Sequence, residues 1–594
     1  MTKKMKKMLS LFLCIAMLFT LTACSSSATS NAAKDTGKEE TSDGLSFTPG
    51  TYVAEAPGRN GILKLEVTVD ESKILSVKVL EHSETARLSD APIEVIPQKI
   101  VEGQTLKVDT IAGASLTSGA ILAAAKDALI KAGGDINKLM KDVAKEKVEV
   151  KDAETEIVIV GAGASGMIAS IKAAAAGKKV ILVEKMGMLG GGDTMMASTL
   201  LNAAGSSVQE KLNIPNSSAE DFYKQLDGIA TQKKMPADRT TLKTYADRSG
   251  TMVDWLVELG VPFGRITNTF QHKIEDGSAP GTHIVTALSK ELDRLNVDYR
   301  LNTKATSIIM EDGKATGIEV ETPDGNYKIK AKAVIMTTGG FSNNPELLAK
   351  YNPTWLNRPT TGSASLTGDG IIMAEKIGAA LYNMDQVKAN YLAHIIDDGS
   401  AVSLTAINNH TVLINHDGKR FVNEDHGSIN YKSEQMMKQK GSEAYAVFDQ
   451  TVIEDLKLMK GYNDSGYFIS ADTLEELADK IDVNKENFLK TMKDYQTYAT
   501  TGVDKEFGRK ISDPIDKSKY YAALVTPSMQ STYGGIKVDK TGHVISTEEK
   551  VIPGLYAAGS TSGHGAAAGE VGYALIVAVV YGDVVGEAVV ADLK

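Results

Sequence analysis

The chain has 594 residues, of which 42% are hydrophobic, and its formal net charge is −10. This length suits two to four domains, and the negative charge disfavours a nucleic-acid partner. Its two cysteines, Cys14 and Cys24, both lie near the N-terminus, so the later sequence excludes disulfides, cysteine metal sites, iron–sulfur clusters and thioether-linked haem. We therefore expect no metal site, and any internal electron carrier must be organic.

The N-terminal segment predicts export and lipid attachment. Lysines at residues 3, 4, 6 and 7 precede a short apolar run from Leu9 to Leu21, which is too short to span a bilayer comfortably. The run leads to Leu21-Thr-Ala-Cys24, which is typical of a bacterial lipoprotein signal over residues 1–24. We expect Cys24 to carry the lipid anchor on the extracytoplasmic face of the cell membrane, and an ordinary secretory signal is the alternative. Residues 25–45 are polar without an apolar period, which predicts a flexible tether.

The next segment predicts a small α+β domain over residues 46–133. Apolar residues alternate over 63–69 and 74–80, as in half-buried strands, and a helix is expected over 118–131. Between them lies Asp109-Thr-Ile-Ala-Gly-Ala-Ser115-Leu-Thr-Ser. Its small residues allow a close backbone approach, and its hydroxyls cluster where a helix N-terminus would favour a phosphate. An ordinary capped helix start is the alternative. A charged linker is expected over 134–153.

This segment resembles the FMN-binding domain family. The resemblance is carried by Gly50-Thr-Tyr52, by His82-Ser-Glu-Thr85, and by the hydroxyl-rich signature, in which Ala112 stands at a Ser/Thr position. It implies an FMN attached by its phosphate to the hydroxyl of Ser115. It also implies a flavin transferase that makes the bond during maturation.

A second nucleotide site is predicted by residues 157–184. A buried strand, Ile157–Val160, leads into Gly161-Ala-Gly163-Ala-Ser-Gly166, a helix to Ala176, a strand over 180–183, and Glu184. The glycines let the backbone approach a pyrophosphate at the helix N-terminus, and Glu184 can hold ribose hydroxyls. Far along the chain, an Ala- and Val-rich segment over 573–590 is interrupted by glycines and acids. A buried helix is therefore expected there.

Four later blocks resemble the fumarate reductase and flavocytochrome flavoprotein family: Gly190-Gly-Gly-Asp-Thr194, Val334 to Phe341, Thr367-Gly-Asp-Gly370 and Gly554 to Gly559. The resemblance implies an α/β fold with a Rossmann-like FAD-binding domain in two parts, 154–380 and 511–594. An inserted α+β capping domain would occupy 381–510. The FAD contacts it implies are Gly161, Gly163, Ala164, Gly166, Glu184, Asp193, Thr194, Ala305, Gly339, Asp369, Gly559, Ser560 and Leu575. In the family, FMN relays electrons to FAD, FAD gives a hydride to an activated C=C bond, and a protein acid protonates the neighbouring carbon.

The acceptor-binding positions of the family are changed in this chain. Asn390 and Ser531 stand where the family has histidines, and Ile453 stands where it has the proton-donating arginine. A relay glutamate remains as Glu424, but its partner arginine is Ser428. The family's C-terminal arginine falls near residues 568–569, which are alanine and glycine. Arginine is the natural bidentate partner of a carboxylate, so these losses disfavour fumarate and urocanate.

Tyrosines replace the missing groups near the flavin-facing blocks, namely Tyr391, Tyr431, Tyr533 and Tyr573. A tyrosine can act as a general acid or bind an enone oxygen. Tyr533 is the first candidate for the proton donor, and Asn390, Ser531 and Tyr573 complete the predicted catalytic set. His564 is a second candidate that fits a flavin-supporting role better. His394 and His426 lie in the cap segments, where exposed loop histidines are the plainer interpretation.

The expected function is reduction of the C=C bond of a small, neutral, enone-like acceptor. Electrons would come from a membrane quinol or NADH-linked donor and pass through FMN and FAD. Three alternatives stay open: a fumarate- or urocanate-type reductase of a carboxylate acceptor, a flavin dehydrogenase running in reverse, and a non-catalytic electron-transfer protein.

Overall fold

The computed structural model describes residues 44–84, 89–111, 114–141, 150–197, 200–232, 237–396, 399–510, 514–563 and 574–594. The first described domain is a three-stranded antiparallel sheet, β1 (Gly50–Pro57), β2 (Ile62–Val69) and β3 (Ile74–Glu81), with helices α2 (Asp90–Gly103), α3 (Ser115–Lys131) and α4 (Ile136–Leu139). One face of β2 buries Leu63, Leu65 and Val67 in the same core as α3, because alternate side chains of a strand point to one face. Leu139 is fully buried there, so this domain extends past the predicted boundary at 133.

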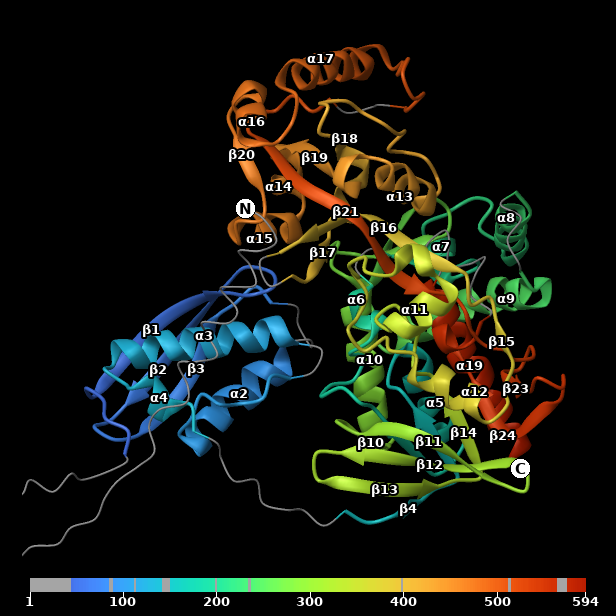
Figure 1. Ribbon diagram of the computed structural model, residues 1–594. Coiled ribbons are helices and arrows are strands. Elements are labelled where there is room, and N and C mark those ends of the chain that lie inside the picture. The colour runs from blue at the N-terminus through green and yellow to red at the C-terminus, as the bar shows by residue number, and fades with distance from the viewer. Residues whose placement is uncertain are drawn as a thin grey trace, which may run out of the picture. The chain divides into compact units, whose positions relative to one another are not determined.

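A six-stranded sheet forms the centre of the second domain (Figure 1). Its order is β10 (Asp298–Arg300), β6 (Val180–Val183), β5 (Ile157–Val160), β14 (Ala333–Met336), β24 (Val551–Ala557) and β23 (His543–Ile545). All neighbouring pairs are parallel except β23 with β24. The strands at 157–160 and 180–183 have the predicted bounds, and the predicted Rossmann-like α/β fold is confirmed.

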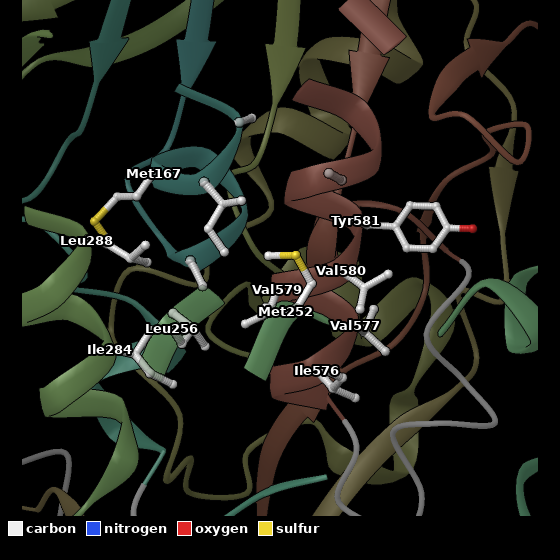
Figure 2. Packing of buried hydrophobic residues seen from close by; sticks show 14 of the residues in the cluster. Met167, Met252, Leu256, Ile284, Leu288, Ile576, Val577, Val579, Val580 and Tyr581 are labelled. Carbon is white, nitrogen blue, oxygen red and sulfur yellow. The ribbon is translucent and has the colours of Figure 1, made fainter. Parts of the chain in front are cut away.

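Helices α5 (Ala164–Ala175) and α19 (Ala574–Asp592) pack against each other beside this sheet. Glycines make the contact close, because a Cβ at Gly582 would lie 2.8 Å from the backbone of Ser165 and one at Gly586 would lie 3.2 Å from the backbone of Ala169. By length and composition α19 could cross a membrane, but 61% of its apolar window is buried inside the protein. Figure 2 shows its Ile576, Val577, Val579, Val580 and Tyr581 in one apolar cluster with Met167 of α5. The predicted buried helix is therefore confirmed.

Smaller elements complete this domain. A four-stranded sheet consists of β11 (Lys304–Glu311), β12 (Lys314–Thr322), β13 (Gly325–Lys330) and β4 (Ala153–Glu154), and a three-stranded sheet consists of β7 (Leu201–Asn202), β9 (Gln271–Ile274) and β8 (Phe263–Thr267). A short pair joins β15 (Leu381–Tyr382) to β22 (Gly535–Ile536). The helices are α6 (Asp193–Met196), α7 (Ser207–Lys211), α8 (Ala219–Gln232), α9 (Arg239–Glu258), α10 (Pro280–Arg294), α11 (Pro345–Tyr351) and α12 (Asp369–Lys376).

The capping domain is built on a six-stranded antiparallel sheet. Its order is β17 (Ala401–Ser403), β16 (Val387–Ile395), β21 (Tyr520–Thr532), β19 (Ala444–Asp449) and β18 (Val412–Ile414), and β20 (Ile469–Ala471) also pairs with β21. The cap helices are α13 (Ile429–Met437), α14 (Gln450–Asp455), α15 (Lys457–Asp464), α16 (Leu474–Lys480) and α17 (Lys485–Thr501). The central strand β21, the long arrow in Figure 1, lies after residue 510. The predicted cap boundary of 381–510 therefore misses the strand on which the cap sheet depends.

Candidate flavin and acceptor sites

The turn between β5 and α5 is shaped by its glycines. Gly161 has a φ of 102°, and a Cβ there would lie 2.5 Å from the carbonyl oxygen of Thr337. A Cβ at Gly166 would overlap the carbonyl oxygen of Gly161. Gly163 differs, because the nearest atom to its Cβ position is the Thr194 hydroxyl at 3.6 Å. Two of the glycines thus permit backbone packing, and the third leaves space for a ligand at the helix N-terminus.

Acidic side chains lie around this turn. Glu184 is 8% exposed and accepts hydrogen bonds from the backbone N–H of Ala162 (2.7 Å) and Met186 (2.8 Å). Its pKa is raised by burial, against the lowering effect of those hydrogen bonds. Asp369 accepts from Lys185 at 2.6 Å, and this contact helps to lower its pKa although burial opposes the shift. Glu184 is the residue predicted to hold ribose hydroxyls, and Asp369 is a predicted FAD contact.

Asp193 lies where the FAD-binding domain meets the cap. It accepts hydrogen bonds from the Ser363 backbone at 3.2 Å and from the Ser531 hydroxyl of β21 at 2.9 Å. Burial raises its pKa, and the positive charge of Lys388 acts in the opposite direction. The neighbouring Thr194 hydroxyl accepts from the Ala164 backbone at 3.0 Å.

A cavity of about 1960 Å³ opens at the carboxyl ends of the parallel strands. Twelve of the predicted FAD contacts line it: Gly161, Gly163, Ala164, Glu184, Asp193, Thr194, Ala305, Gly339, Asp369, Gly559, Ser560 and Leu575. Gly166 does not line it and serves the packing of the turn. The set fits FAD, because it combines an open helix N-terminus for the pyrophosphate with buried carboxylates for ribose hydroxyls.

The cap contributes a polar wall to the same cavity. This wall contains Lys388, Tyr391, Asp425, His426, Lys432 and Ser531. FAD-binding and cap residues therefore share one space, in which a bound flavin and a small acceptor can meet.

Of the three predicted catalytic residues that the structure describes, Asn390, Ser531 and Tyr533, only Ser531 lines the cavity. Asn390 is fully buried and does not itself line the cavity; its amide donates to the hydroxyls of Thr361 (3.2 Å) and Ser403 (2.9 Å), two residues that do line it. Tyr533 is 3% exposed and does not line the cavity. Tyr573 and His564 lie outside the described residues. Asn390 lies on β16 and Tyr533 directly follows β21, and the resemblance that singled them out does not indicate which way a side chain points.

Other candidates also take defined places. The His394 ring is hydrogen-bonded to the Leu524 carbonyl at 2.8 Å, and the His426 ring packs on Tyr431 with centroids 4.2 Å apart. Ile453, at the family's donor position, is buried in the cap core. Ser428 caps the N-terminus of α13 by accepting from the Tyr431 backbone at 3.2 Å.

Lys432 is a cavity residue that the sequence analysis did not identify. It lies on α13, is 3% exposed, and donates to the Tyr391 hydroxyl at 3.1 Å and the Glu424 carbonyl at 2.9 Å. Burial lowers the pKa of Lys432 to about 8, although Asp425 and Glu424 act to raise it. Its one sequence signal, a lysine one turn after the helix cap at Ser428, also fits an ordinary surface lysine.

Buried ion pairs hold the loop that leads into α13. Arg420 binds Glu424 at 2.6 Å and Asp504 at 3.0 Å, with these side chains at most 1% exposed. Arg509 binds Asp425 at 3.0 Å and approaches Glu424 at 3.5 Å. The family's relay glutamate thus serves here in a charge network that positions the polar wall.

The FMN segment offers one exposed hydroxyl at the start of α3. Ser115 is exposed, and Ala114 at the N-cap provides no side-chain cap. The Thr117 hydroxyl is instead bonded to the buried Glu84, and the Ser118 hydroxyl binds the Ile111 N–H (3.1 Å) and the Ala114 carbonyl (2.8 Å). Among the three hydroxyls of this helix start, Ser115 is the accessible one.

Comparisons with known proteins agree with this geometry. Residues 156–571 match the FAD binding domain family, and residues 58–130 match the FMN-binding domain family. The chain is 30% identical to the NADH:acrylate oxidoreductase of Vibrio harveyi over 91% of its own length and 61% of that protein. It is 31% identical to a cytochrome-type fumarate reductase of Shewanella frigidimarina over 73% of its length and 77% of that protein, and 29% identical to the urocanate reductase of Eggerthella lenta, over 90% and 91%.

Solved structures point the same way. The open conformation of a flavocytochrome c3 fumarate reductase superposes with a TM-score of 0.65 at 29% identity, covering 74% of this chain and 78% of that one. A ketosteroid dehydrogenase of Sterolibacterium denitrificans shares the fold, with a TM-score of 0.63 at 20% identity over 74% of this chain and all of that one. The chain belongs to the family of the FAD binding domain, as an FMN-binding domain fused to a fumarate reductase-like flavoprotein.

Proposed function

We propose that this flavin-dependent oxidoreductase reduces an activated C=C bond of a small acceptor that carries no more than one carboxylate. The observation that supports the proposal is the shared cavity, where FAD-binding residues and proton-bearing cap side chains face one space. Relatives are named for reduction of acrylate, fumarate and urocanate, whose C=C bonds are each conjugated to a carboxylate. Bound FAD would supply the hydride, and the chain would bind the acceptor, exclude water and supply the proton.

The charges of the cap wall argue against a dicarboxylate. Lys388 acts on the buried Asp193, and Lys432 lies beside Glu424 and Asp425. Each ammonium therefore already has a carboxylate near it. A second acceptor carboxylate placed against this wall would be desolvated beside lysines that already have carboxylate neighbours, which is costly.

Reoxidation of the reduced protein tests this function. The flavin-loaded protein would be reduced with dithionite under anaerobic conditions and mixed with 2-cyclohexenone, methyl vinyl ketone, acrylate, urocanate or fumarate. We expect a neutral enone or acrylate to reoxidise the flavins at least tenfold faster than fumarate. Fastest reoxidation by fumarate would overturn the charge argument. If no acceptor of the panel reoxidises the flavins but a redox dye does, the result would instead support a non-catalytic electron-transfer protein.

We also propose that FMN is attached covalently to Ser115 by a flavin transferase. The exposed Ser115 hydroxyl at an uncapped helix start supports this site, since the N–H groups there can bind the phosphate. When the protein is made together with the transferase, denaturing gels should show flavin fluorescence. Ser115→Ala should abolish it and Ser115→Thr should retain it. Persistent fluorescence in Ser115→Ala would refute the assignment.

Lipid anchoring at Cys24 and supply of electrons by a membrane quinol or NADH-linked donor complete the proposal. The support for the lipid anchor is the apolar run before Leu21-Thr-Ala-Cys24. Cys24→Ala should move the protein from the membrane fraction to the soluble extracytoplasmic fraction. Unchanged membrane association would argue against the anchor.

A further inference from the structure

We infer that Tyr391 delivers the proton to the acceptor carbon and that Lys432 is the cation that sustains this donor. The inference rests on the proposed C=C reduction and names the acid for it. Sequence comparison left that role open, because the arginine expected to perform it is Ile453, buried in the cap core.

The two side chains meet at the cavity wall. Tyr391 lies on β16 and Lys432 on α13, both line the cavity, and they are 1% and 3% exposed. The Lys432 ammonium donates to the Tyr391 oxygen at 3.1 Å and lies 4.3 Å from the centre of its ring. Because the phenol oxygen accepts this bond, its own O–H remains available to a second partner in the cavity.

The pair is electrostatically suited to release a proton. Burial raises the pKa of Tyr391 above its ordinary value, so the isolated phenol would be a poor acid. A phenolate formed beside Lys432 would be stabilised by the ammonium, since charges interact more strongly in a dry site than in water. Burial lowers the pKa of Lys432 to about 8, Asp425 and Glu424 act to raise it, and Arg509 opposes them. At this pKa the charged form still predominates at neutral pH.

The proposed step is balanced in protons and electrons. Bound reduced FAD would supply the hydride for one new C–H bond, and Tyr391 donates its O–H proton to the neighbouring carbon to form the other. The phenolate then takes a proton from the Lys432 ammonium. The neutral amine regains one from solvent through the cavity, which Asp425 also lines. The C=C bond thereby gains one hydride and one proton, and the flavin is oxidised.

Single-turnover reoxidation of the dithionite-reduced holoprotein tests this donor, with the faster of acrylate and methyl vinyl ketone as the probe. Tyr391→Phe and Lys432→Met should each slow reoxidation by about 100-fold or more, the usual range for loss of a general acid. In the unsubstituted protein the rate should fall as pH rises through about 8, because Lys432 then loses its proton. Lys432→Arg should retain reoxidation and move this fall to higher pH, since arginine stays charged.

Matched control variants distinguish loss of the proton donor from general disruption of the fold. Tyr520→Phe on β21 and Lys438→Met at the exposed end of α13 should leave the rate within twofold, because neither residue lines the cavity. Reoxidation by ferricyanide, which needs no carbon protonation, should be unchanged in every variant. If Tyr391→Phe and Lys432→Arg both reoxidise like the unsubstituted protein, with the same pH profile, the donor assignment is wrong and the reductase stands. If the unsubstituted protein fails with every acceptor of the panel, both proposals fall.

Discussion

The two walls of the cavity are built on different principles. The FAD-binding edge is made largely by main chain, with Gly161 and Gly166 permitting contacts that any Cβ would block. The cap wall is made by side chains such as Lys432 and Tyr391, which reach the cavity from separate elements. A main-chain site tolerates little change, whereas a side-chain wall can change its chemistry with a few substitutions. Family membership therefore predicts the cofactor better than the acceptor.

The largest effect should come from breaking the charge network of the cap. Arg420→Met would leave the fully buried Glu424 and Asp504 without their shared cation, and we expect a loss of about 3–5 kcal/mol in stability. Urea unfolding followed by tryptophan and flavin signals measures this. Lys490→Met, which removes an exposed pair with Asp494, should leave stability essentially unchanged, because solvent screens such a pair. Equal effects of the two variants would mean that the network does not hold the wall.

Gly166→Ala tests the main-chain wall. The new Cβ would overlap the Gly161 carbonyl oxygen, so we expect loss of bound FAD and destabilisation of about 3 kcal/mol. The flavin-to-protein absorbance ratio and urea unfolding report both effects. Gly228→Ala in α8 is the control, because no atom lies within 4 Å of its Cβ position, and it should be neutral or stabilising by about 0.5–1 kcal/mol. Full FAD content in Gly166→Ala would contradict the main-chain account.

Asn390→Ala separates structure from catalysis in the cap. It removes hydrogen bonds to Thr361 and Ser403 from a fully buried site, which should cost about 1–3 kcal/mol. Asn390 does not line the cavity itself and reaches it only through the hydroxyls of Thr361 and Ser403, so the reoxidation rate of the folded variant should change by less than threefold. A hundredfold loss of rate without a loss of stability would restore Asn390 as a catalytic residue.

The smallest effect is expected for Tyr533→Phe. Tyr533 is buried and does not line the cavity, so the substitution should cost about 1 kcal/mol or less and leave reoxidation within threefold. Tyr391→Phe, measured beside it, should be slower by about 100-fold. The reverse order would mean that sequence alignment identified the donor better than the cavity does.

Local patterns predicted the FAD-binding edge well. The glycine turn, the strands at 157–160 and 180–183 and Glu184 lie within one short stretch, so their spacing alone encodes the βαβ unit. The cap was harder. Its central strand β21 pairs with β16, whose residues lie about 140 positions earlier, and Lys432 meets Tyr391 from 41 positions away. Such contacts depend on tertiary packing between distant segments, and local sequence patterns do not predict them.

The placement of β24 and α19 also constrains the order of folding. These elements, residues 551–557 and 574–592, complete the sheet and the helix layer around β5 and α5, which lie nearly 400 residues earlier. During synthesis the nucleotide-binding unit therefore stays incomplete until residues 551–592 have been made. Until then the apolar face of α5 has no partner helix. We expect the domain to depend on chaperones during that interval, and FAD to bind late, when the two ends of the fold have met.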